Sequence, residues 1–228
     1  MPVTNDFEKM LLSTNFVKAQ DLQDLAIKER ELTSKRIFQL KITPIKGNFD
    51  YQHLKDIHNY IFKDVYTWAG KDRFDIGLNG VFLKGNQHFV PGSELPKYSN
   101  IIFNELKEQN FLKDCKDINS FSKGIATFMM EINALHPFRE GNGRTQRIFL
   151  NQLAENSDYK MDLNLISEYK MVTACKLASK LKPEFLENLI KENLKQFLEN
   201  EDNNFKKSID ELTEYIEQNT LKKNLDLN

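Results

Sequence analysis

The spacing of apolar residues constrains the fold of this chain more than any other feature. Leu, Ile and Phe recur at separations of three and four residues over long stretches, which is the period of an α-helix. Glycine and proline, which interrupt helices, number only 9 and 6 among 228 residues and fall mainly between these stretches. The sequence therefore predicts a mostly helical protein, with helices near residues 20–40, 50–64, 92–109, 119–135, 144–156, 165–178, 183–199 and 205–219.

One segment, residues 73–90, departs from the helical period. It holds Gly77, Gly80 and Gly85 among apolar side chains, a pattern that favours a short β-hairpin over a helix. We term this segment the flap. The predicted fold class is all-α, a helical bundle with a short β-hairpin flap.

The charge balance and the cysteines exclude several classes of protein. Lys and Arg number 32 against 33 Asp and Glu, so no global field concentrates nucleic acid or anionic lipid. No apolar run approaches membrane-spanning length, and neither direct nucleic-acid binding nor membrane binding is expected. Cys115 and Cys175 are isolated, without zinc-ligand spacing, and are expected to be reduced. These features together predict a cytoplasmic protein.

The stretch from His136 to Arg147 carries the strongest indication of chemistry. It reads His-Pro-Phe-Arg-Glu-Gly-Asn-Gly-Arg-Thr-Gln-Arg and lies between two predicted helices. Pro137 disfavours helix at His136, and Gly141 and Gly143 permit backbone angles that turn amide groups toward the next helix. Free amides at a helix N-terminus form a site for an anion.

Two arginines strengthen this interpretation. Arg144 and Arg147 stand three residues apart at the start of the predicted helix, hence on one face, and two guanidinium groups there can grip a polyphosphate. Without a bound anion the two cations would repel each other. They also oppose the helix macrodipole, so a purely structural sequence has little reason to place both there.

Two further side chains complete a reactive site. Glu140 stands in the same loop, and a carboxylate beside phosphates is a usual ligand of Mg²⁺. His136 has an ordinary pKa near 6.5, which suits removal of a proton from an attacking hydroxyl. The residues indicate phosphoryl or nucleotidyl transfer, but they do not determine which phosphorus is attacked.

Residues 136–147 resemble the signature of the Fic family, H-P-F-x-[D/E]-G-N-G-R-x-x-R, and match it at every specified position. The stretch Trp68-Ala-Gly-x-x-Arg73 resembles a second segment of that family, and Lys84-Gly-Asn resembles the tip of its flap. The resemblance covers roughly residues 40–198. It implies an N-terminal helical extension (1–40), a Fic catalytic core (41–198) and a C-terminal helical tail (199–228).

The resemblance implies a protein adenylyltransferase, which transfers AMP from Mg²⁺-bound ATP to a Ser, Thr or Tyr hydroxyl of a target protein. Self-modification and a toxin-like role are also implied. His136 would deprotonate the target hydroxyl, Phe138 would anchor the loop in the core, and Glu140 would hold Mg²⁺. The nucleotide and its phosphates would be bound by the remaining motif residues, Gly141, Asn142, Gly143, Arg144 and Arg147.

The same resemblance suggests partners. Lys84 and Gly85 of the flap would bind a target segment as an added strand, through main-chain hydrogen bonds. The stretch between Arg73 and Lys84 is longer than the commoner family flap, so target choice is less transferable than catalysis. Topoisomerase subunits are targets of toxin-like relatives and form a first screen, and a homo-oligomer is a further expectation.

Inhibition by the chain's own tail is a hypothesis from the same resemblance. Many members carry a helix, [S/T]-x-x-x-E-[G/N], whose glutamate pairs with the second motif arginine, here Arg147. Thr213 and Glu217 have this spacing, although Gln218 departs from the pattern. A separate small antitoxin protein, or no inhibitor at all, is the competing hypothesis.

The reaction itself allows two further interpretations. A Fic-fold kinase or a related nucleotide transferase would keep the fold and transfer a different group. A catalytically silent nucleotide-binding module would keep the fold and the ligand without any transfer. The complete set of His136, Arg144 and Arg147 argues against permanent silence.

The remaining histidines and aromatic residues are expected to be structural. His58 lies at helical spacing from apolar residues and is expected in the core, as are Tyr66 and Trp68. His53 and His88 are expected at the surface or in the flap.

Overall fold

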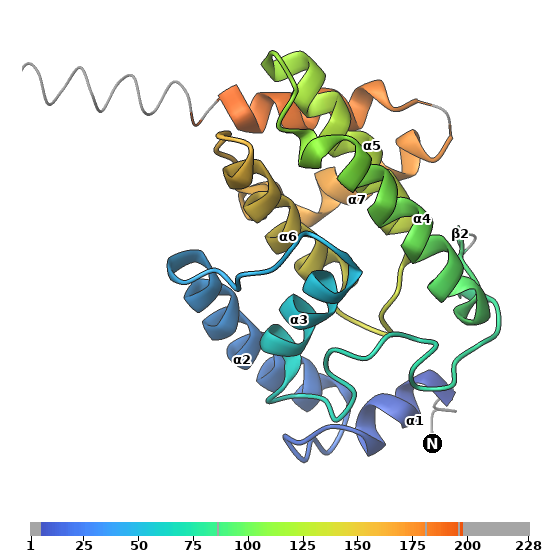
Figure 1. The fold of residues 1–228 in the computed structure, drawn as a ribbon. Coiled ribbons are helices and arrows are strands. Elements are labelled where there is room, and N and C mark those ends of the chain that lie inside the picture. Colours follow the sequence, from blue (N-terminus) through green and yellow to red (C-terminus); the bar gives the residue numbers. More distant parts are fainter. Residues whose placement is uncertain (1–5, 86, 181, 196, 198–228) are drawn as a thin grey trace, which may run out of the picture.

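The computed structural model describes residues 6–85, 87–180, 182–195 and 197 (Figure 1). The named helices are α1 (Asp6–Ser13), α2 (Leu22–Ile42), α3 (Tyr51–Phe62), α4 (Leu95–Glu108), α5 (Ile118–Leu135), α6 (Asn142–Asn156) and α7 (Glu168–Ala178). Residues 184–195 are also helical, and short 3₁₀ turns lie at Gly92–Glu94, Asn110–Leu112 and Leu163–Leu165. Strands β1 (Phe82–Lys84) and β2 (Gln87–Phe89) form a two-stranded sheet.

The core lies between α3, α5 and α6. Helix α3 packs against both α2 and α6, while α5 packs against α4, α6 and α7. The side chains that fill this core are apolar and fully enclosed, among them Phe62, Phe121, Phe138 and Phe149. Because α5 and α6 follow one another in the sequence and pack together, the loop between them emerges at one end of the core (Figure 1).

Local side chains set where the central helices begin. The carboxylate of Asp50 accepts the backbone N–H of His53 at 2.8 Å and caps α3. Asp117 and Ser120 form a reciprocal capping box at the start of α5. Such caps satisfy amides that have no acceptor inside the helix. The helices predicted over residues 20–178 are confirmed, with ends within a few residues of the predicted ones.

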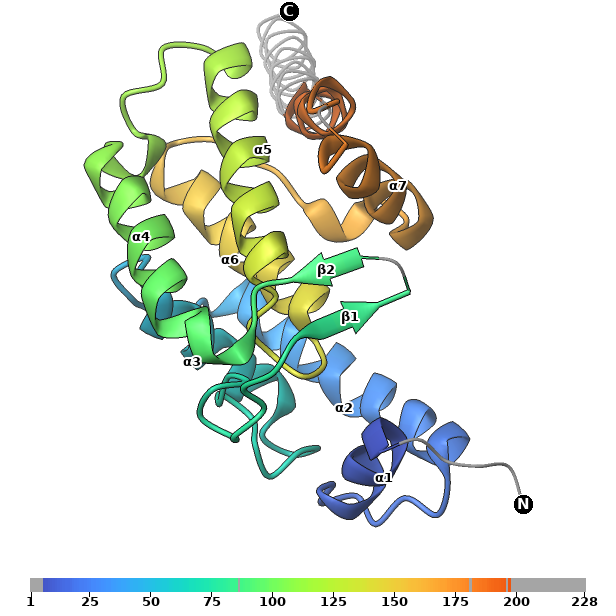
Figure 2. The same cartoon turned by 90° about the vertical axis from the view of Figure 1, so that its right-hand side faces the viewer.

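The flap is only partly a hairpin. Strands β1 and β2 pair antiparallel with Phe82 opposite Phe89 (Figure 2), and Gly85 at the tip has a φ of 58°. The first half of the predicted segment instead forms turns, including a bond from the Leu78 amide to the Arg73 carbonyl at 2.8 Å. The Val90 amide bonds to the Ala134 carbonyl of α5 at 3.1 Å and holds the hairpin over the end of that helix.

Some predictions about single elements were wrong or stay open. Helix α1 was not predicted, because its sequence is polar and short. His53, predicted at the surface, is 2% exposed because its spacing of four residues from Ile57 places it on the buried face of α3. The helix predicted near 205–219 lies outside the described residues. Within the described part of the chain, no helix has both the length and the apolar character needed to cross a bilayer.

Candidate active site

The loop between α5 and α6 has a backbone fixed by its own residues. Helix α5 ends at Leu135, and His136 adopts a left-handed conformation with φ 44° and ψ 58° before Pro137. Gly141 has φ 82°, and a Cβ atom there would lie 2.2 Å from the Phe62 ring. Only glycine fits this position, because both the dihedral angle and the space exclude a side chain. Helix α6 then begins at Asn142, directly after the turn.

The Asn142 side chain braces the loop. Its Oδ1 accepts the Phe138 amide at 2.9 Å and its Nδ2 donates to the Phe138 carbonyl at 2.7 Å. Asn142 is 3% exposed and Phe138 is fully buried. The Asn142 side chain thus shapes the loop, and the N–H groups of the first turn of α6 remain without helical acceptors. The predicted role of Phe138 as an anchor agrees with this placement.

His58 of α3 packs against the loop and forms a hydrogen bond to it. Its ring stacks on Phe138 with centroids 3.9 Å apart. The Gly70 amide donates to His58 Nδ1 at 2.8 Å, so the proton lies on Nε2, which donates to the Glu140 carbonyl at 3.1 Å. Burial lowers the pKa of His58 to about 3. His58 is a neutral core residue, as the sequence predicted, but it also joins the loop to the segment after α3.

Arg73 ties the flap to the loop. Its Nε donates to the His136 carbonyl at 3.0 Å, and its Nη2 donates to the carbonyls of Leu135 at 3.1 Å and Val90 at 2.6 Å. Its backbone amide bonds to the Pro137 carbonyl at 2.8 Å. Arg73 is fully buried. One guanidinium therefore fixes the backbone on both sides of His136 and the end of the hairpin.

His136 lies under the hairpin, and 8% of it is exposed. Its ring centroid is 4.0 Å from that of Phe89 and 5.7 Å from that of Phe82. Neither ring nitrogen has a hydrogen-bond partner among the described residues. Burial and the charges of Lys84 and Arg73 lower the pKa of His136 to about 3. The imidazole is therefore neutral at pH 7 and has a lone pair available to accept a proton.

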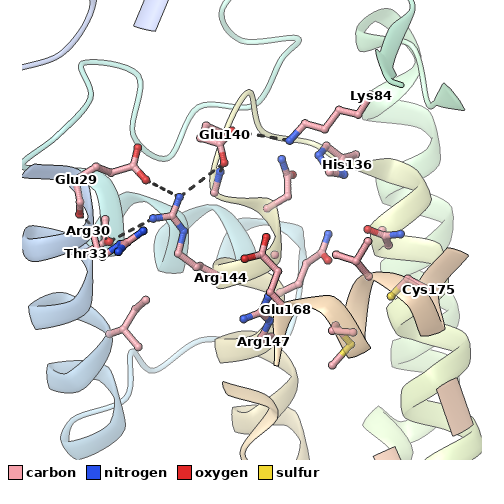
Figure 3. A pocket seen from close by; sticks show the side chains of 18 of the residues that line it. Glu29, Arg30, Thr33, Lys84, His136, Glu140, Arg144, Arg147, Glu168 and Cys175 are labelled. Carbon is pink, nitrogen blue, oxygen red and sulfur yellow. Dashed lines mark hydrogen bonds and ion pairs between the residues drawn. The ribbon is translucent and has the colours of Figure 1, made fainter. Parts of the chain in front are cut away.

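A cavity of about 780 Å³ opens over the loop. Its walls come from α2, the hairpin, the loop with the start of α6, and α7 (Figure 3). This volume lies in the range of small-molecule and cofactor sites. The cavity is lined by all the motif residues predicted to bind nucleotide and by the predicted base and metal ligand, namely His136, Glu140, Gly141, Asn142, Gly143, Arg144 and Arg147.

The cavity floor suits an anion. A Cβ atom at Gly143 would meet only Arg147 Nη2, at 3.6 Å, so the space above the first turn of α6 stays open. Arg147 Nε is buried and has no partner among the described residues. Burial lowers the pKa of Arg147, whereas the negative charge of Glu168 raises it. Open amides and a guanidinium with an unpaired N–H are groups that bind phosphate.

Arg144 has a counter-charge that sequence reasoning missed. Its Nη2 lies 2.6 Å from Glu29 of α2 and 3.7 Å from Glu140 (Figure 3). Glu29 therefore offsets part of the repulsion predicted between the two arginines, although, after the larger effect of burial, the charge of Arg144 still lowers the pKa of Arg147. Helix α2, which the sequence analysis assigned to an N-terminal extension outside the catalytic core, supplies part of the cavity wall. Only the tertiary structure brings Glu29 next to a residue so distant in the chain.

Glu140 is the predicted metal ligand, and it lines the cavity. Its carboxylate accepts the Gly141 amide at 2.8 Å, lines the cavity, and is 3.8 Å from Lys84 Nζ of the flap. No group of three or more His, Cys, Asp and Glu side chains converges among the described residues. One carboxylate beside bound phosphates fits Mg²⁺, which takes one or two protein oxygens and fills its shell with phosphate oxygens and water.

Helix α7 adds residues that the sequence analysis did not assign. Glu168, Met171 and Cys175 line the cavity opposite α2. Burial raises the pKa of the Cys175 thiol to about 11, so it stays protonated at neutral pH. No local motif marks these side chains, because only the packing of α7 against α5 brings them here.

The predicted site also included the tip of the flap and two residues of the tail. Gly85 lies at the hairpin tip, outside the residues that line the cavity. Thr213 and Glu217 lie outside the described residues, so their predicted inhibitory role stays a prediction.

The free energy of unfolding is expected to fall as the pH is lowered from 7 to 5. In the unfolded chain His58 and His136 take up protons below about pH 6.5, whereas in the folded protein both stay neutral to about pH 3. The unfolded state therefore binds more protons, and each histidine lowers the free energy of unfolding by up to about 1.4 kcal/mol per pH unit of acidification. Urea unfolding at pH 7, 6 and 5 measures this slope.

Two histidine variants isolate the contribution of His58. His58→Gln removes one of the two histidines whose pKa is lowered by burial, so the slope should fall by up to about 1.4 kcal/mol per pH unit. His88→Gln, at an exposed position of β2, should leave the slope unchanged. Equal slopes for the wild type and His58→Gln would show that His58 does not stay neutral in the folded protein.

Comparison with known proteins places this site in a family. The profile of the Fic/DOC family matches residues 48–154. Protein adenylyltransferase VbhT of Bartonella schoenbuchensis is 39% identical over 166 residues, which are 72% of this chain and 33% of the relative. The probable protein adenylyltransferase y4lH of Sinorhizobium fredii is 37% identical over 128 residues, which are 56% of this chain and 64% of the relative.

A solved structure agrees in fold. The N-terminal Fic domain of a putative cell filamentation protein from Bartonella quintana, with bound ADP, is 26% identical, with a TM-score of 0.71. The similarity covers 78% of this chain and 88% of that one. The chain spans between a third and two thirds of the curated relatives' length. The profile match includes α3, the flap, α5 and α6, which build the loop and its cavity, and residues 48–154 of the chain therefore belong to the Fic/DOC family.

Proposed function

We propose that this protein is an adenylyltransferase, which transfers AMP from ATP to a hydroxyl group of a protein. The observation that carries the proposal is the convergence of a neutral His136, the open amides of α6 and Arg147 on one cavity of nucleotide size. The names of the relatives support it, since one is a protein adenylyltransferase and the other a probable one. The ADP bound to the related Fic domain supports a nucleotide as the ligand.

The chemistry requires one bond to form and one to break. The target hydroxyl oxygen attacks the α-phosphorus of ATP while His136 accepts the hydroxyl proton. The bond between the α-phosphorus and the oxygen that bridges to the β-phosphorus breaks, and pyrophosphate leaves. The amides at the start of α6 bind the α-phosphate oxygens, where negative charge develops. Arg144 binds the β- and γ-phosphates, and Arg147 helps to orient the nucleotide.

The metal in this proposal is Mg²⁺, held by Glu140. When held there, Mg²⁺ would neutralise negative charge on the phosphates and on the leaving pyrophosphate. Lys84 Nζ lies near the Glu140 carboxylate in this structure, where a metal ion would compete with it for the same oxygen. The flap lysine would then be free to contact the target segment.

The proposal extends to the target and to regulation. The target is a protein whose hydroxyl-bearing segment pairs with the flap near Lys84 and Gly85, and the protein modifies itself as well. A toxin-like role that is restrained by an inhibitor follows from the family resemblance. The inhibitor is either the tail segment with Thr213 and Glu217 or a small antitoxin protein. Cytoplasmic proteins, topoisomerase subunits first, are the candidate targets.

An experiment with labelled ATP tests the transfer. The purified protein is incubated with Mg²⁺ and ATP labelled at either the α- or the γ-phosphate, with and without a cytoplasmic extract, and label on protein is scored. We expect α-label on protein, lost when EDTA removes Mg²⁺. Label from the γ-phosphate would identify a kinase instead. Absence of label, with ATP binding retained, would identify a silent nucleotide-binding module or an inhibited enzyme.

The Glu217→Gly variant tests inhibition by the tail. If Glu217 pairs with Arg147 and inhibits the enzyme, removal of its carboxylate should raise the yield of α-label. If the variant and the wild type give equal yields of α-label, the tail does not inhibit the enzyme.

A further inference from the structure

Helix α2 lies outside the matched residues 48–154, yet it contributes a carboxylate to the phosphate-binding wall of the cavity. Glu29 Oε1 is 2.6 Å from Arg144 Nη2, and 13% of the Glu29 side chain is exposed. Its other oxygen, Oε2, accepts a hydrogen bond from the Tyr66 hydroxyl. Tyr66 is buried between Phe62 and Trp68, so its hydroxyl holds the Glu29 carboxylate in a fixed position.

Arg144 is held by further contacts on two sides. Its Nη1 donates to Thr33 Oγ1 of α2 at 3.3 Å. Its guanidinium lies over the Phe62 ring, 4.7 Å from the centroid. Arg144 nevertheless lines the cavity, and 28% of its side chain is exposed. The guanidinium is thus anchored along one edge and one face, and is open toward the cavity.

The pairing also reduces repulsion within the site. Arg144 and Arg147 occupy the start of the same helix, and the charge of Arg144 contributes to lowering the pKa of Arg147, after the larger effect of burial. Glu29 places a compensating negative charge beside the first arginine. A long arginine side chain otherwise samples many rotamers, and fixing it before the ligand arrives reduces the entropy lost on binding.

We propose that Glu29 is a positioning residue that holds the Arg144 guanidinium in the orientation that binds the β-phosphate of the nucleotide. The inference rests on the proposed function, in which Arg144 binds the β- and γ-phosphates. Glu29 itself contacts no nucleotide and acts through Arg144. Helix α2 is therefore a functional part of the nucleotide site.

The contacts favour positioning over competition with the nucleotide. A guanidinium has five N–H donors, and the contacts with Glu29 and Thr33 engage only some of them. The remaining donors can bind phosphate while the Glu29 pair stays in place. The bond from Tyr66 holds Glu29 in its place on α2, so the pair remains when a nucleotide enters.

The test compares nucleotides of different length in the full chain. Glu29→Gln keeps an oxygen for Tyr66 and removes the charge. We expect the Kd for ATP and for ADP to rise about tenfold, and the Kd for AMP, which has no β-phosphate, to change less than about twofold. Calorimetric titration of wild type and variant measures all three. Glu31→Gln, the same charge change at an exposed position of α2, should leave every Kd unchanged.

A double substitution shows whether the effect passes through Arg144. In the Arg144→Ala background, Glu29→Gln should have no further effect on the Kd for ATP. An equal loss for ATP, ADP and AMP would mean general destabilisation and would overturn the proposal. Tighter ATP binding by Glu29→Gln would mean that Glu29 competes with phosphate, and would also overturn it.

The titrations test the role of Glu29 and the labelling experiment tests the proposed activity, so each proposal can be contradicted without the other. If the wild type binds ATP and ADP but transfers no α-label, the proposed activity is wrong and the Kd pattern still tests Glu29. If α-label is transferred and the Kd values of Glu29→Gln equal those of the wild type, Glu29 has no positioning role.

Discussion

His136→Ala is expected to lower the rate of AMP transfer by about 10² to 10⁴, the contribution of a general base. The His136 ring lines the cavity beneath the hairpin, and its nitrogens have no partner among the described residues. No phosphate-binding group is removed, so the Kd for ATP should stay within about twofold of the wild-type value. Initial rates with α-labelled ATP, together with calorimetric titration, measure both quantities.

Control variants and the pH profile sharpen this prediction. His88→Ala, on the exposed flap, should keep the wild-type rate, and His136→Asn tests the base with a residue that tolerates the left-handed backbone. Because the pKa of His136 is lowered to about 3, its neutral form persists from about pH 8 to about pH 5 and the rate should not fall through its protonation. A tenfold loss of rate per pH unit below about 6.5, present in the wild type and absent in His136→Asn, would contradict the buried placement of the ring.

Arg73→Leu is expected to lower the free energy of unfolding by about 4 kcal/mol, within the range of about 3 to 5 kcal/mol for breaking a buried charged network. The substitution leaves the carbonyls of Leu135, His136 and Val90 without their donor. Each buried acceptor that loses its partner costs about 1–3 kcal/mol. Urea unfolding followed by circular dichroism measures the loss.

The same variant should also disturb catalysis. Arg73 fixes the backbone carbonyl of His136, so Arg73→Leu should lower the transfer rate even at temperatures where the protein remains folded. Arg73→Lys keeps the charge but lacks the planar guanidinium, so its transfer rate should lie between those of the wild type and Arg73→Leu. Arg30→Leu, at an exposed position, should change stability by less than about 0.5 kcal/mol. If Arg30→Leu and Arg73→Leu lowered the free energy of unfolding equally, the hydrogen bonds of Arg73 would not account for the loss.

Most of the reactive loop was predictable from the sequence because its geometry is local. Pro137 and Gly141 restrict the backbone within a few residues, and a helix must follow, so the amides at the start of α6 are open whatever the rest of the chain does. The spacing of Arg144 and Arg147 on one helix is equally local. The resemblance to the Fic signature, which the profile match to residues 48–154 supports, added the reaction that the residues alone left open.

Residues that act through distant partners were not predictable in the same way. Periodicity showed that one face of α3 is buried, but not that His58 on that face bonds to Glu140 in the loop. His53 was predicted at the surface because it has no partner at metal-ligand spacing, whereas the structure buries it. Arg73 belonged to a predicted motif, while its bonds to three separate backbone carbonyls depend on how the flap meets α5.

The sequence by itself determined the helical fold, the loop with its anion-binding amides, and the candidates for the base and the metal ligand. These follow from dihedral restrictions and hydrogen bonds that span only a few residues. The tertiary structure alone decided that α2 and α7 form the cavity walls and that Glu29 meets Arg144. It also decided that His136 is buried beneath the hairpin, where loss of solvent lowers its pKa. Helix packing makes these contacts, and an amphipathic pattern specifies which face is buried but not what it is buried against.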